Sequence, residues 1–155
     1  MVRVLAPQPT LTGERMQTSN FFRTKGNPNA WAISRGLPRF YDGKVYEPLR
    51  PTREMLRSGD EGFDRMYAEL LSKLDPRKVV DDLGLDAILL CWENPAPHWH
   101  KCHRRLVAEW LEAALGIEIT EMGFLRGEVP AYGAMPLSPS WAAKQAKRSP
   151  QLGLF

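Results

Sequence analysis

The chain has 155 residues, of which 43% are hydrophobic and 25% are charged. This length predicts one ordinary domain with tails, and the composition is typical of a soluble globular protein and excludes wholesale disorder. No apolar run approaches the roughly 18 residues that a membrane helix needs, and residues 1–10 lack the features of a signal peptide. Because the chain has only two cysteines, it is not a disulfide scaffold, and we expect a cytoplasmic protein.

The net charge of +3 is unevenly distributed along the chain. Residues 1–57 carry ten Lys and Arg against four Asp and Glu, or +6, whereas residues 58–125 carry seven against thirteen, or −6. Residues 126–155 carry four against one, or +3. Basic ends around an acidic middle suit a chain that meets a polyanion along one face, although two solvated ends would give the same distribution.

Two short strands are predicted near the start, over residues 16–21 and 30–34, with a turn between them. Residues 37–51 contain three prolines and a glycine, which predicts a long ordered loop. Thr52 is a suitable N-cap for a short helix through Arg57, and Gly59 follows as a helix breaker.

Two helices are predicted next. Apolar residues recur at helical spacing over residues 63–74, which predicts an amphipathic helix. Asp75 and Pro76 are typical of an N-cap and a first helical position, and Gly84 is typical of a C-terminal stop. We therefore expect a short helix over Pro76–Leu83.

The pattern that follows predicts the fold class. Residues 87–92 are continuously apolar, as in a strand buried on both faces of a parallel sheet. Helical spacing over residues 106–115 and a strand at residues 117–119 then complete a βαβ crossover. The prediction is a small single α/β domain over residues 1–124, with a mostly parallel sheet flanked by helices.

Polar chemistry concentrates after the buried strand. Every cysteine and histidine lies in one short segment, as Cys91, His98, His100, Cys102 and His103. This segment follows the carboxyl end of a strand, where ligands bind in open α/β sheets. Cys102 opens the next helix beside His103 and Arg104, and the positive helix end favours a thiolate there. Cys102 is therefore the best candidate nucleophile.

The same residues leave alternatives open. The helix start, with Arg104 or Arg105, could instead hold a phosphate or a carboxylate. Glu93 could act as an acid or base, or could orient an arginine. No cofactor is required, and zinc is the alternative, bound by the two cysteines and one or two histidines, although the spacing lacks a paired C-x-x-C signature. In the purely structural alternative, the first cysteine is a small buried residue and His103 is satisfied by the backbone.

The segments I-L-L-C-W-E-N-P and C-H-R-R-L-V-A-E-W-L-E, in this order, resemble the signature region of the domain of unknown function 488 family. The upstream segments T-S-N-F-F, I-S-R-G-L-P, Y-D-G-K and S-K-L-D-P-R-K-V extend this resemblance over residues 16–120. The resemblance implies a small cytoplasmic α/β domain without an assigned activity. Its shared polar residues would be Cys91, Glu93, Cys102, His103 and Arg104. The chain departs from the family in a longer connection at residues 96–101, and because His98 and His100 fall there, the zinc alternative is weakened.

Residues 125–155 contain four prolines, three serines and two lysines, which predicts an exposed, flexible and partly disordered tail. The tail ends in Q-L-G-L-F, which resembles the short peptide by which bacterial DNA polymerases and repair proteins bind the replication sliding clamp. In such a peptide, Leu154 and Phe155 would enter a hydrophobic pocket while the Gln151 amide fixes the register. The candidate partner-binding residues are Gln151, Leu152, Leu154 and Phe155. An apolar end that folds back on the domain is the alternative.

The basic N-terminal third also interleaves cations with aromatic residues between Phe21 and Tyr46. Cationic side chains with exposed rings are what single-stranded nucleic acid needs. The alternative is that most of these rings lie in the core, because a small domain must bury its aromatic residues.

These observations predict a DNA-maintenance accessory protein of repair or replication, with a pocket that binds or acts on a nucleotide or a nucleic-acid end. Its partners would be the sliding clamp and DNA. The candidate catalytic residues are Cys102, His103, Glu93 and Cys91, and the candidate ligand-binding residues are Arg104, Arg35, Thr18 and Asn20. A non-catalytic metal- or anion-binding adaptor module and a small-molecule enzyme unrelated to DNA are the rival hypotheses, and whether the pocket is catalytic stays open.

Overall fold

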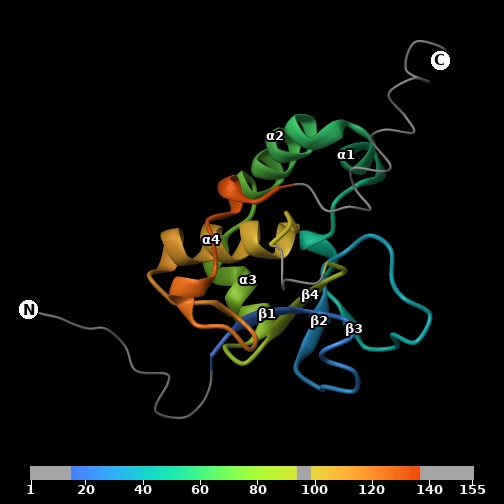
Figure 1. The fold of residues 1–155 in the computed structure, drawn as a ribbon, viewed down its shortest axis with the longest axis vertical. Coiled ribbons are helices and arrows are strands. Elements are labelled where there is room, and N and C mark those ends of the chain that lie inside the picture. Colours follow the sequence, from blue (N-terminus) through green and yellow to red (C-terminus); the bar gives the residue numbers. More distant parts are fainter. Residues whose placement is uncertain (1–14, 94–98, 137–155) are drawn as a thin grey trace, which may run out of the picture.

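The computed structural model describes residues 15–93 and 99–136 (Figure 1). Within these ranges the strands are β1 (Gln17–Asn20), β2 (Ala30–Ala32), β3 (Lys44–Val45), β4 (Ile88–Cys91) and β5 (Thr120–Glu121). The α-helices are α1 (Arg53–Arg57), α2 (Gly59–Ser72), α3 (Pro76–Leu83) and α4 (His103–Leu115). Short 3-10 helices are η2 (Glu47–Leu49), η3 (Arg126–Glu128) and η4 (Tyr132–Ala134). None of the described helices is long and apolar enough to cross a membrane.

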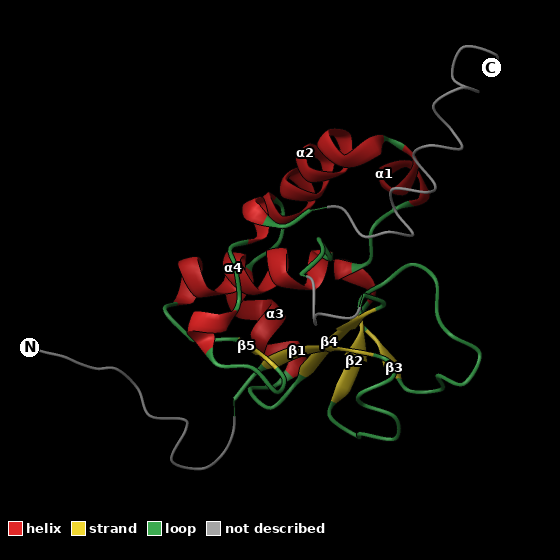
Figure 2. Cartoon of the chain, viewed as in Figure 1, coloured by secondary structure: helices red, strands yellow, loops and turns green. Residues whose placement is uncertain are grey.

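The strands form one sheet in the order β3-β2-β4-β1-β5, and all neighbouring pairs are parallel. In Figure 2 the helices lie above the sheet, while loops lie below it. This arrangement confirms the predicted α/β fold with a parallel sheet and flanking helices. Because the strands are parallel, their carboxyl ends share one edge, which we call the carboxyl edge.

Strand β4 lies between β2 and β1, and all four of its residues are buried. Leu89 and Cys91 belong to the larger core, which also contains residues of all four helices. Ile88 and Leu90 belong to a smaller core on the other side, with Phe21. The sequence runs continuously apolar there because both faces of the strand are covered.

Helix boundaries follow local chemistry. Phe63, Tyr67 and Leu71 form the buried stripe of α2. Helix α3 begins after Asp75, whose side chain accepts a hydrogen bond from the Arg77 amide at 3.0 Å. Gly116 ends α4 in the left-handed conformation, with φ of 71°, which a glycine adopts without strain.

Two strands lie where the sequence pattern placed something else. Strand β3 occupies two residues within the predicted loop at 37–51, too few to produce a periodic signal. Strand β5 begins at Thr120 rather than over the predicted residues 117–119. The Ile119 amide donates to the Glu112 carboxylate at 2.8 Å, so it is engaged by a side chain before the strand begins.

The first part of the predicted tail is folded onto the domain. Tyr132 and Met135 are buried, and the Tyr132 hydroxyl lies 2.9 Å from a carboxylate oxygen of Asp64 in α2. The Tyr132 amide donates to Glu109 of α4 at 2.7 Å. Proline and glycine exclude a long helix here, but they allow packed 3-10 turns. The remainder of the tail, with the peptide at residues 151–155, lies outside the described residues.

Candidate functional site

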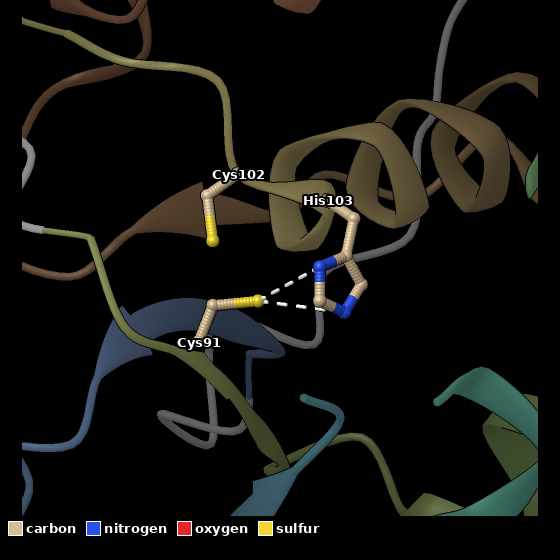
Figure 3. Close-up of side chains that lie close together, drawn as sticks. All are labelled: Cys91, Cys102 and His103. Carbon is tan, nitrogen blue, oxygen red and sulfur yellow. Dashed lines mark hydrogen bonds between the residues drawn. The ribbon is translucent and has the colours of Figure 1, made fainter. Parts of the chain in front are cut away.

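Three of the predicted site residues converge at the carboxyl edge. Cys91 is the last residue of β4, Cys102 is the N-cap of α4 and His103 is its first residue. The two sulfur atoms and a ring nitrogen of His103 all lie within 4.8 Å of one another (Figure 3). We call these three residues the thiol cluster. Both cysteines are free. The sequence predicted Cys102 in the first turn of the helix, whereas the structure places it one residue earlier, at the N-cap.

The imidazole of His103 is held in one orientation. Its Nε2 lies 2.7 Å from the carbonyl oxygen of Ile33, which can only accept, so Nε2 carries a hydrogen. Its Nδ1 lies 3.3 Å from Sγ of Cys91. The ring packs edge-on against Tyr67, with centroids 5.2 Å apart. Nδ1 is therefore the ring nitrogen that can accept a hydrogen bond from Cys91.

The two thiols differ in their surroundings. Burial raises the pKa of Cys91 well above its ordinary value, and the neighbouring Cys102 adds to this. Burial also opposes charge at Cys102, but a hydrogen bond from Cys91, the Arg104 guanidinium and His103 hold the pKa of Cys102 well below its ordinary value. Cys102 is half-buried and lies at the positive end of α4, whereas Cys91 is fully buried. We therefore assign the thiolate to Cys102 and the neutral thiol to Cys91.

Arg104 is a buried cation next to the thiol cluster, with a side chain 3% exposed. Its Nε and Nη2 donate to the two carboxylate oxygens of Glu121 at 3.1 and 3.0 Å, and Nη2 also donates to the Glu93 carbonyl at 3.0 Å. Although burial disfavours its charge, the anionic groups of Cys102 and Glu121 raise the pKa of Arg104. Its Nη1 is buried and has no hydrogen-bond partner among the described residues. The guanidinium thus keeps its charge and an unused donor.

Glu121 is held by a second set of contacts. The Thr18 hydroxyl donates to Glu121 at 2.6 Å, and Nη1 of Arg105 donates to the Thr18 oxygen at 2.8 Å and to the Ile119 carbonyl at 3.2 Å. Burial lowers the pKa of Arg105. Sequence reasoning missed Glu121 because it belongs to no motif. It also lies two residues beyond the predicted strand at 117–119, so no sequence pattern indicated that this carboxylate would be buried and paired.

The other predicted ligand-binding residues have structural contacts. Thr18 and Asn20 are fully buried in β1, and the Asn20 amide donates to the Glu93 carbonyl at 3.4 Å. Arg35 donates to the Pro51 carbonyl at 2.8 Å and pairs with Glu47 at 3.3 Å.

These contacts show that several predicted site residues hold other residues in place rather than joining the thiol cluster. The Glu93 carbonyl holds Arg104 directly, and Asn20 contacts the same carbonyl. Thr18 acts on Arg104 through Glu121, and Arg35 holds the loop before α1. His100 is not among the three clustered residues of the described chain, and His98 lies outside that part.

Comparisons of the chain with protein-family models, with curated proteins and with solved structures find no match. The chemistry of the thiol cluster therefore follows from its own geometry. It combines a thiolate at a helix start, a neutral thiol, an imidazole of fixed orientation and a buried guanidinium.

Proposed function

We propose that this protein is a DNA-maintenance accessory protein whose Cys102 thiolate acts on a nucleotide or a nucleic-acid end. The observation that carries the proposal is the placement of Cys102 at the start of α4, beside the buried guanidinium of Arg104. A thiolate is the nucleophilic form of cysteine, and a guanidinium attracts phosphate. The same two groups would then serve attack and substrate attraction.

The neighbouring residues have distinct roles in this proposal. Cys91 is the neutral thiol between two acceptors, the Cys102 thiolate and Nδ1 of His103, and its single hydrogen can be donated to either. Glu121 and the Glu93 carbonyl hold Arg104 and are positioning groups. Arg104 stabilises the thiolate before attack, and its positive charge attracts an anionic substrate group toward Cys102.

The link to DNA rests on the sequence. Residues 1–57 carry a net +6, and the terminal Q-L-G-L-F resembles a sliding-clamp-binding peptide. A small protein that is delivered by such a peptide reaches DNA wherever the clamp is loaded. Two free thiols also suit a reducing cytoplasm, which the proposal includes.

The test is protection of Cys102 from alkylation in the full chain. Iodoacetamide should label wild-type protein at Cys102 but not Cys102→Ser, and nucleotides or short oligonucleotides with a terminal phosphate should slow the labelling. Arg104→Lys keeps a positive charge but loses the planar guanidinium, so it should weaken the protection more than it changes the labelling rate. Labelling that no nucleotide or oligonucleotide slows would contradict the proposal.

A zinc-binding adaptor is the second candidate, favoured by the donor set of the thiol cluster. Two sulfur atoms and one imidazole nitrogen suit a zinc site with an open fourth position, and the Nε2 contact to Ile33 is typical of a zinc-binding histidine. Zinc would supply a Lewis acid held by Cys91, Cys102 and His103. The adjacent guanidinium of Arg104 opposes a second cation, which is why we place this candidate second. Zinc in a one-to-one ratio with purified protein would favour it over the thiolate.

A further inference from the structure

Large exposed hydrophobic side chains gather at the carboxyl edge. Of the six in the described part of the chain, Phe22, Leu37, Phe40 and Trp92 lie in segments that leave this edge, whereas Leu85 and Leu125 lie elsewhere in the sequence. Phe22 follows β1, Leu37 and Phe40 lie in the loop after β2, and Trp92 follows β4. Burial of apolar surface is favourable, so a cluster of exposed rings on one edge indicates a binding surface.

Three of these rings lie together and form what we call the aromatic platform: Phe22, Phe40 and Trp92. They are 53%, 43% and 41% exposed. The Phe22 ring centroid lies 5.5 Å from that of Phe40 and 6.4 Å from that of Trp92. Each ring thus contributes to one continuous, half-exposed aromatic surface.

The aromatic platform is held from below. The buried Phe21 ring contacts Trp92 at 5.4 Å and Tyr41 at 5.1 Å between centroids. The indole nitrogen of Trp92 donates to the Gly36 carbonyl at 2.9 Å, which joins the loops after β4 and β2. Trp92 is therefore held in place before any ligand arrives, which reduces the entropy lost when a ligand binds to it.

The surrounding charge selects the kind of ligand. Residues 21–44 carry five Lys and Arg against one Asp, a net +4. The ammonium group of Lys25 lies 4.6 Å from the Phe40 ring centroid, and Arg23 and Arg39 are exposed nearby in the sequence. A ligand that suits this surface has flat apolar faces and a negative backbone.

We propose that the aromatic platform binds unpaired bases of a single-stranded nucleic acid, while Lys25 and the nearby arginines neutralise its phosphates. Single strands expose their base faces for stacking, whereas a duplex buries them. Trp92 directly follows Cys91, so the platform and the thiol cluster both lie at the carboxyl end of β4, with Cys91 in the larger core and Trp92 packed on Phe21 of the smaller core. This inference rests on the proposed function and identifies its substrate as single-stranded.

The test is fluorescence anisotropy of a labelled oligothymidine titrated with the full chain. Replacing Phe22 or Phe40 by Ala should weaken binding by about tenfold each, because one stacked base is lost. Phe22→Tyr keeps a ring and should bind like wild type. Leu85→Ala is the matched control, because Leu85 is as exposed as Phe40, at 43%, but precedes β4 at the opposite edge of the sheet.

Two outcomes would contradict the proposal that the aromatic platform binds single strands. One is wild-type affinity in the Phe22→Ala, Phe40→Ala double variant, with thermal melting unchanged. The other is duplex DNA binding as tightly as the single strand and equally well to the ring variants, since charge alone would then suffice. Failure of the proposed function is distinguishable: ring-dependent binding without protection of Cys102 would keep the platform and reject the thiolate role.

Discussion

Cys91 and Cys102 have different surroundings in the same cluster. Cys91 is enclosed by the apolar core at the end of β4, whereas Cys102 is half-buried at the start of α4 and feels the charge of Arg104. The low dielectric of the interior makes charge expensive for Cys91, and the adjacent guanidinium offsets that cost for Cys102. One thiol is therefore a donor and the other an anion.

The first prediction concerns the pH dependence of Cys102 alkylation. Only the thiolate reacts, so the rate rises with pH through the pKa of the thiol and then levels off. Because the pKa of Cys102 is lowered, the rate should already be level at about pH 8, whereas an ordinary thiol with a pKa of about 8.5 is still rising there. The measurement is the iodoacetamide rate between acidic and alkaline pH.

Variants of Cys91 provide the control for this profile. Cys91→Ala removes the hydrogen bond that lowers the pKa of Cys102, so the midpoint should move to higher pH. Cys91→Ser keeps a donor and should move it less. A wild-type midpoint at the ordinary value, or labelling of Cys91 instead, would reject the assigned charge states.

The second prediction concerns the buried ion pair between Arg104 and Glu121. Glu121→Gln leaves the guanidinium buried without its anionic partner and should lower the free energy of unfolding by about 3–5 kcal/mol. Glu118→Gln removes an exposed carboxylate that pairs with Arg15 and should cost less than about 1 kcal/mol. Urea denaturation of both variants measures the difference. Equal losses of unfolding free energy would show that the buried pair contributes no more to stability than the exposed pair.

Among the secondary-structure elements, the longer helices and the buried strand were predicted from the spacing of apolar residues. Helix α2 is long enough to show an apolar stripe, and β4 is long enough to show an apolar run. The cap residues Asp75 and Gly116 mark the start of α3 and the end of α4. Strand β3 has two residues and owes its existence to pairing with β2, a contact between distant segments. Such pairing leaves no local signal in the sequence.

In the candidate site, too, some contacts were predictable from the sequence and others were not. The approach of Cys91 to Cys102 and His103 was predictable because a crossover brings a strand end and a helix start together. The Glu121 partnership with Arg104 was not, since β5 reaches the site only through its pairing with β1. Thr18 and Asn20 were predicted as ligand-binding residues, but β1 is an inner strand and buries them.

The third prediction concerns the segment after β5. Tyr132 of η4 packs against α2 and α4 through Asp64 and Glu109, so it fastens residues 126–136 to the domain. Tyr132→Ala should lower the free energy of unfolding by about 3 kcal/mol, the usual loss for a buried ring. Tyr132→Phe removes only the hydroxyl contact and should cost about 1 kcal/mol. An unchanged melting temperature in Tyr132→Ala would mean that this segment is not part of the core.

At the scale of the whole molecule, the carboxyl edge carries both the thiol cluster and the aromatic platform. Cys91 ends β4 and Trp92 follows it, so both surfaces begin at the carboxyl end of this strand. The two loops that leave β1 and β2 at this edge, residues 21–29 and 33–43, carry four Lys and Arg against one Asp, whereas α2 carries one Arg against four Asp and Glu. This asymmetry would orient a polyanion toward the edge before contact.

The last prediction concerns delivery of the domain by its C-terminal peptide, residues 151–155. A short peptide binding a hydrophobic pocket buries few side chains, so we expect affinity for a bacterial sliding clamp on the order of tens of micromolar. Binding of the domain to DNA at the same time should raise the apparent affinity, because the second contact becomes intramolecular. The Leu154→Ala, Phe155→Ala double variant should lose clamp binding in surface plasmon resonance while keeping its affinity for single-stranded DNA, because the aromatic platform is a separate surface. A wild-type chain that does not bind the clamp would reject the delivery role, and a large fall in the melting temperature of the double variant would show instead that the peptide packs against the domain.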